Sequence, residues 1–208
     1  MWTKGDKRKR WKRMASIANL STLTQLKVLH VQNNGETISE GTLGSMVQME
    51  TLQLHLATMT DLPFDIFNMS KSRRLTLECS HVVKMESKFC EFQNLIHLKL
   101  WQCHMLEELP DLHKLRTLKR LDIFECSKLK KFPKEFNESG AFPSLEIFSL
   151  VYLNELQELP LIDEGAMSAL KIFTTIEDKQ FQNNNAAQLF FYKYLFAILC
   201  KDSFYFSF

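Results

Sequence analysis

A leucine-rich phrase recurs along most of the chain at a nearly constant interval. Residues 95–103 read LIHLKLWQC, and six other segments carry the same phrase or a weaker copy of it. Four successive intervals between equivalent residues are 23 residues long, and the last two are 27 and 25. Composition alone does not produce such regularity, so we expect a chain of stacked repeats. The equivalent positions are Leu29, Leu52, Leu75, Leu98, Leu121, Phe148 and Phe173.

Each repeat predicts a short strand followed by a return segment. The L-x-L part of the phrase alternates with period two, which is typical of a strand with one buried face. Leucines three residues apart, such as Leu112, Leu115 and Leu118, favour a 3₁₀ or turn-like segment. Four of the five prolines follow a reference position by 11 or 12 residues. They end the return segment, because proline fixes φ and donates no backbone hydrogen bond.

Stacking of these repeats determines the predicted fold. No single repeat buries its leucines alone, whereas stacked repeats share a continuous core. The sequence therefore predicts an α/β leucine-rich solenoid of about seven repeats over residues 20–177. Its curved parallel sheet forms the concave face, and short helical or irregular segments form the other side. Cys103, Cys126 and Asn34 occupy one equivalent position, where a small donor bonds backbone carbonyls inside the turn.

Two longer segments resemble a known family of repeats. Residues 112–133, LHKLRTLKRLDIFECSKLKKFP, resemble the plant cytoplasmic type of leucine-rich repeat. Residues 141–160, AFPSLEIFSLVYLNELQELP, are similar to the late repeats of plant intracellular nucleotide-binding immune receptors, the disease resistance proteins. The resemblance implies a non-catalytic, defense-related recognition domain in the cytoplasm. Its implied partner is a pathogen effector, a host guardee or the nucleotide-binding domain of a receptor.

The chain departs from that family in one respect. We find no GxxxxGK[ST] motif, and EGTLGSM at 40–46 lacks the lysine and is predicted to be a loop between repeats. The switch and ATPase functions of the family therefore do not carry over, and the chain resembles a detached repeat domain. The alternative function is a free-standing leucine-rich repeat scaffold or adaptor without an immune role.

The outward-facing strand positions form lanes across the sheet, and one region of them combines aromatic and charged residues. Alternation places Trp101 on the open face rather than in the core. Exposed aromatic side chains ringed by polar and arginine side chains are typical of binding hot spots. A partner contact and an internal cover, by the C-terminal tail or a neighbouring loop, both fit this pattern. The predicted partner-binding residues are His97, Lys99, Trp101, Arg120, Asp122, Phe124, Val151 and Tyr152.

Cysteine and histidine usage gives no sign of catalysis or metal binding. Five cysteines without a CxxC pair indicate neither a disulfide framework nor a zinc site. A reducing, cytoplasmic location is the better expectation. No histidine stands at ligand spacing to a cysteine or an acid, and no nucleophile-elbow phrase occurs. We therefore predict no enzyme activity, no cofactor and no metal.

The two ends of the chain differ from the repeats. Residues 1–19 are a basic arm whose first 13 residues carry a net charge of +6. The arm is either a solvated linker or a nucleic-acid patch. We do not expect nucleic acid as a partner, because this net charge is small for stable binding to nucleic acid. Residues 178–208 form an aromatic tail, interpreted as a cap, a membrane contact or sequence read past a truncated array. Its apolar stretch at 189–199 is shorter than the roughly 20 residues of a bilayer span, so we predict no transmembrane segment.

Overall fold

A computed structural model describes residues 20–33, 38–160 and 165–176 of the 208-residue chain. The predicted basic arm and aromatic tail lie outside these ranges, and so does Asn34. The predicted repeat domain falls almost entirely inside them.

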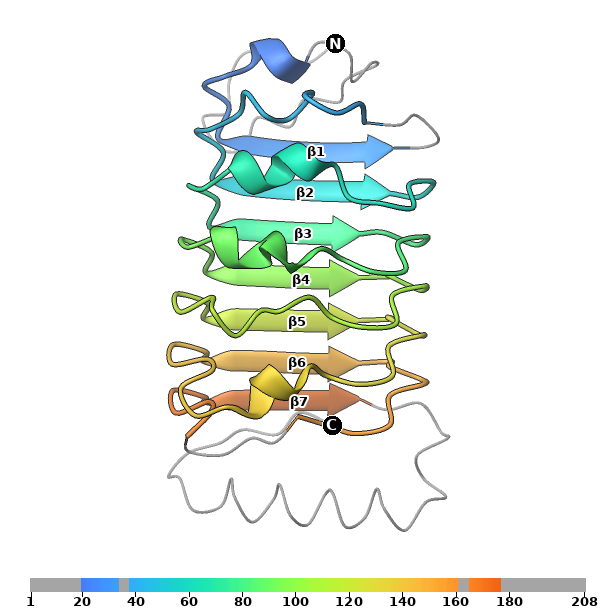
Figure 1. Ribbon diagram of the computed structural model, residues 1–208, viewed down its shortest axis with the longest axis vertical. Coiled ribbons are helices and arrows are strands. Elements are labelled where there is room, and N and C mark those ends of the chain that lie inside the picture. The colour runs from blue at the N-terminus through green and yellow to red at the C-terminus, as the bar shows by residue number, and fades with distance from the viewer. Residues whose placement is uncertain (1–19, 34–37, 161–164, 177–208) are drawn as a thin grey trace, which may run out of the picture.

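Seven parallel strands form one sheet, and their order in the sheet is their order in the chain (Figure 1). The register pairs each reference residue with its equivalent in the next repeat, for example Leu75 with Leu98 and Leu98 with Leu121. The predicted solenoid with a parallel sheet is therefore confirmed, as are the lanes across it. The strands are β1 (Val28–Asn33), β2 (Thr51–Leu56), β3 (Arg74–Glu78), β4 (His97–Trp101), β5 (Arg120–Phe124), β6 (Ile147–Val151) and β7 (Ile172–Ile176).

The return segments are short 3₁₀ helices and turns, and the part of the chain that the structure describes contains no α-helix. Pro63 and Pro133 stand immediately before two of the helices, where their fixed φ begins the turn. The helices η2, η3 and η4 lie over one face of the sheet (Figure 1), and we call the opposite face the open face. The helices are η1 (Leu20–Thr22), η2 (Phe64–Asn68), η3 (Ser87–Glu91) and η4 (Lys134–Asn137).

The core runs the length of the solenoid between the sheet and the return segments. The reference residue of each strand is buried, from Leu29 in β1 to Phe173 in β7. The repeat with the 27-residue interval is wider, and aromatic rings fill the added space. The centroid of the Phe136 ring lies 5.2 Å from that of Phe132 and 4.8 Å from that of Phe142. Phe136 of this longer repeat is thus packed into the core, whereas residues 137–140 are exposed.

A buried carboxylate fixes one connection between repeats. Oδ2 of Asp65, at the start of η2, accepts hydrogen bonds from the backbone N–H groups of Leu43 at 2.6 Å and Gly44 at 2.8 Å. Both donors belong to the 40–46 segment, which is a run of turns as predicted. Asp65 therefore ties two neighbouring turns together in the interior.

The strands end in two ways, and the difference decides which cysteines meet. After β4, β5 and β6 the chain enters the left-handed region at Gln102, Glu125 and Tyr152, with φ of 54° to 55°. This turn rotates the next residue into the core, and Cys103 and Cys126 are fully buried. No such residue follows β3, so Cys79, one position earlier in its repeat, occupies the place beside Cys103. Hydrogen bonding with Cys103, together with burial, raises the pKa of the Cys79 and Cys126 thiols.

Candidate functional site

The register brings six of the eight predicted partner-binding residues onto two adjacent strands. His97 lies beside Arg120, Lys99 beside Asp122, and Trp101 beside Phe124. Because alternate residues of a strand point to the same face, all six side chains project from the open face. The equivalent position of β6 holds Val151, next to Phe124. The sequence-derived lanes therefore coincide with a real cluster of side chains.

Trp101 contacts both a histidine and a lysine. Its ring makes an edge-on contact with His55, with ring centroids 6.4 Å apart and an interplanar angle of 71°. The Nζ of Lys99 lies 4.5 Å from the centroid of the Trp101 ring and 5.3 Å from that of the Phe124 ring. A cation over an aromatic face is attracted by the ring quadrupole. These contacts hold the half-buried indole in place on the open face.

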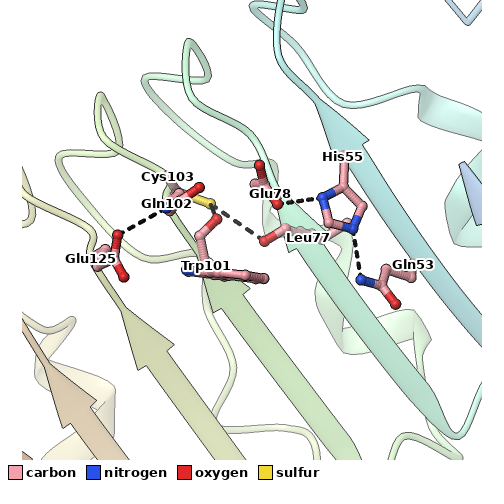
Figure 2. A network of polar contacts seen from close by, with 8 residues as sticks. All are labelled: Gln53, His55, Leu77, Glu78, Trp101, Gln102, Cys103 and Glu125. Carbon is pink, nitrogen blue, oxygen red and sulfur yellow. Dashed lines mark hydrogen bonds and ion pairs between the residues drawn. The ribbon is translucent and has the colours of Figure 1, made fainter. Parts of the chain in front are cut away.

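Polar groups on β2 and β3 orient the ring of His55 (Figure 2). One ring nitrogen of His55 contacts the Glu78 carboxylate on β3, and the other lies 2.6 Å from the side-chain nitrogen of Gln53 on β2. The sequence interpretation placed His55 and Glu78 on the open face but not in the site. Both residues occupy the position equivalent to Trp101 in their own strands. This equivalence is the feature of the sequence that could have assigned them to the site. His55 and Glu78 extend the site across β2 and β3.

Asp122 is the polar centre of the neighbouring part of the site. Its side chain is only 2% exposed, and its Oδ2 lies 2.6 Å from Nε of Arg120 and 2.7 Å from Nε2 of His97. Burial by itself would raise the pKa of Asp122, but hydrogen bonds from His97, Arg120 and Ser149 together lower it below its ordinary value. The carboxylate is therefore ionised near neutral pH, and it fixes the positions of the Arg120 guanidinium and the His97 ring.

Val151 and Tyr152 occupy different environments at the end of β6. The Val151 side chain is 6% exposed, so its surface is taken up by packing. Tyr152 is 45% exposed and adopts the left-handed backbone conformation with a φ of 55°. Tyr152 lies at the rim of the site, where its ring is accessible, whereas Val151 supports the neighbouring Phe124 from within the sheet.

Replacing Asp122 by asparagine is expected to change how stability depends on pH. Because its folded-state pKa is lowered, ionised Asp122 stabilises the fold above its ordinary pKa of 3.8 and loses this contribution as pH falls through the lowered value. Asp122→Asn should cost about 1–3 kcal/mol at pH 7, and the difference from wild type should shrink towards pH 2. Urea unfolding at several pH values measures this, with the exposed Asp61→Asn as control. A penalty that does not vary with pH contradicts the assignment.

Two further features concern metal binding and membrane crossing in the part of the chain that the structure describes. No group of three or more histidine, cysteine or acidic side chains there is arranged to hold a metal ion. Within the same residues, no helix has both the length and the apolar character needed to cross a bilayer.

Comparison with known proteins supports the fold. No protein-family model matches the chain, and no curated protein matches it. Among solved structures, a leucine-rich repeat protein of Leptospira interrogans matches 76% of this chain with 21% identity and a TM-score of 0.60. An internalin of Listeria monocytogenes matches 82% of the chain with 20% identity and a TM-score of 0.52. The matches span 40% and 54% of the lengths of those two proteins. These likenesses show a leucine-rich repeat fold.

Proposed function

We propose that this chain is a non-catalytic protein-recognition module that binds its partner with the open face around Trp101. The contacts of this indole with His55 and Lys99 carry the proposal. Rigid aromatic side chains contribute large contact area at a small entropic cost, and they dominate the energetics of many interfaces. The Arg120 side chain, at the start of β5, is 45% exposed and adds a cation to the same open face.

The face around Trp101 is organised before any partner arrives. Asp122 fixes Arg120 and His97, and Glu78 fixes His55. Side chains that are already ordered lose less conformational entropy on association, so more of their contact energy appears as affinity. This favours partner contact as the role of the site. The alternative, an internal cover by the tail, concerns residues outside the described ranges.

We further propose that this recognition serves plant defense. The resemblance of the repeat phrases to disease resistance proteins supports a cytoplasmic module that senses a pathogen effector or a guarded host protein, or restrains a receptor's nucleotide-binding domain. The likeness of the fold to bacterial repeat proteins is equally compatible with a free-standing scaffold. An immunoblot against residues 84–177 separates the two. A band near the 24.4 kDa of this chain favours the scaffold, and a several-fold heavier band favours the receptor.

Trp101→Ala tests the proposed function directly. Proximity labelling with the wild-type chain identifies partners, and calorimetry then measures their affinities for purified variants. Trp101→Ala is expected to weaken binding by about 2 kcal/mol, or roughly 30-fold. Phe64→Ala is the matched control. Phe64 is exposed and, like Trp101, lies under a lysine, with Lys88 Nζ 3.4 Å from its ring centroid. It belongs, however, to the return side of the solenoid. Wild-type affinity of Trp101→Ala for every partner would reject the proposal.

A further inference from the structure

The residues that immediately precede the strands form a second row, at the opposite end of the strands from Trp101. Each backbone N–H in this row donates a hydrogen bond of 2.8–2.9 Å to the carbonyl oxygen of the residue before it in the row. The seven positions are therefore in register across the whole sheet. They are Lys27, Glu50, Arg73, Ile96, Lys119, Glu146 and Lys171.

Charge alternates along this row, with each acid between two cations. Glu146 pairs with Lys119 at 3.0 Å and with Lys171 at 2.8 Å, and these hydrogen bonds lower the pKa of Glu146 to about 2. Glu50 pairs with Lys27 at 2.8 Å, and Arg73 on its other side adds to the lowering of its pKa.

One position breaks the alternation. Ile96 lies between Arg73 and Lys119, where the pattern calls for an acid. The row consequently holds four cations and only two acids, and the two cations beside Ile96 face each other across an uncharged residue. Adjacent strands are about 4.8 Å apart, so the backbones of Arg73 and Lys119 are separated by about 10 Å. A group seated over Ile96 lies within reach of both long side chains.

An open groove of about 560 Å³ lies at this position. Ile96, half-buried, is its apolar lining residue, and Lys71 adds a third cation to Arg73 and Lys119. Two polar residues of the groove are fixed by the backbone. Asn94 Nδ2 donates to the Ser70 carbonyl at 2.9 Å, and Thr117 Oγ1 donates to the Leu95 carbonyl at 2.9 Å. Glu50, which is paired with Lys27, also lines the groove, so the lining holds three cations and one acid. The groove therefore has an excess of positive charge and is built on fixed hydrogen bonds.

We propose that this groove binds an acidic segment of a partner polypeptide, with a glutamate or aspartate carboxylate seated over Ile96 between Arg73 and Lys119. The carboxylate supplies the acid that the row lacks, and charge-assisted hydrogen bonds to arginine and lysine hold it. The side-chain methylenes of the acid pack on Ile96. The volume of the groove is far larger than a single small anion needs and falls in the range of pockets that enclose larger ligands. A stretch of peptide therefore fits it better than an isolated phosphate.

The electrostatic part of the proposal is testable without a partner. Ile96→Glu places a carboxylate in the gap, Ile96→Lys places a third adjacent cation there, and Ile96→Gln is the uncharged reference. The melting temperature is expected to be highest for Ile96→Glu and lowest for Ile96→Lys. The spread between the two should shrink in 1 M NaCl, because salt screens exposed charges. A melting temperature of Ile96→Lys equal to or above that of Ile96→Glu overturns the proposal.

Binding is measured with a fluorescein-labelled hexaglutamate peptide, followed by fluorescence anisotropy at low ionic strength. Arg73→Ser and Lys119→Ser are each expected to weaken binding by about fivefold or more, which corresponds to about 1 kcal/mol. Lys134→Ser, an exposed cation on η4, removes the same charge outside the groove and should change binding less than about twofold. Equal losses in all three variants would show non-specific attraction and overturn the site.

Two further arms identify the ligand and separate this groove from the open-face site. Inorganic phosphate should compete with hexaglutamate no better than chloride at matched ionic strength, and stronger competition would assign the groove to a free anion instead of a peptide. Trp101→Ala should leave hexaglutamate binding unchanged, because Trp101 lies five residues, about 16 Å, along the strand from Ile96. A loss in Trp101→Ala places the peptide on the open face and overturns the groove. The groove therefore stands or fails independently of the proposed function.

Discussion

Leu98→Ala is expected to lower the free energy of unfolding by about 2–5 kcal/mol. Leu98 is fully buried in β4, the middle strand of the sheet, and its neighbours in the sheet are Leu75 and Leu121. Truncation removes apolar contacts and leaves a cavity that the flanking strands cannot collapse into, because their own leucines are held in register. Urea unfolding followed by circular dichroism measures the loss.

The matched comparison is the same substitution at the first strand, Leu29→Ala. Leu29 is 5% exposed, and its strand pairs on one side only. In a solenoid each repeat contacts only its neighbours, so a central defect weakens two interfaces and a terminal one weakens a single interface. Leu98→Ala should therefore be the more damaging of the two. Equal losses at both positions contradict the nearest-neighbour picture of the stack.

Asp65→Ala is expected to destabilise the fold by about 2–4 kcal/mol, because it leaves backbone donors in the interior without their acceptor. The Asp65 side chain is buried, and its Oδ2 receives the N–H groups of both Leu43 and Gly44. Asp65→Asn keeps a carbonyl acceptor at the same place and loses only the negative charge. The alanine variant should therefore be clearly the less stable of the two in urea unfolding.

Asp61→Ala is the control for Asp65→Ala. Asp61 is exposed, and its carboxylate accepts a hydrogen bond from the neighbouring Thr60 hydroxyl at 2.9 Å. Its removal should change the free energy of unfolding by no more than about 0.5 kcal/mol. If Asp65→Ala is as stable as Asp61→Ala, the buried carboxylate does not hold the connection between the first two turns.

The repeat interval allowed the fold to be predicted. A constant spacing of 23 residues sets the strand register, and period-two alternation separates core residues from open-face residues. Both properties are local to the sequence, so Leu98 and Trp101 were assigned to opposite faces correctly. The core position of Phe136 was not predicted, because this residue lies outside the repeated phrase.

The candidate site was only partly predictable. Its location on β4 and β5 followed from the lanes, but the burial of Asp122 beneath Arg120 and His97 did not. The contact between Trp101 and His55 joins side chains from strands two positions apart in the sheet, and no pattern within one repeat encodes it. Whether these residues bind a partner stays a prediction.

The sequence by itself determined the number of strands, their parallel order and the face to which each strand residue points, because these depend on spacing and alternation alone. Only the tertiary structure decided which side chains pair across turns. It placed Cys79 beside Cys103 and made Asp65 the acceptor for Leu43. These outcomes depend on local backbone turns and on the side-chain rotamers of neighbouring repeats. Such contacts form only when residues far apart in the chain are stacked against each other.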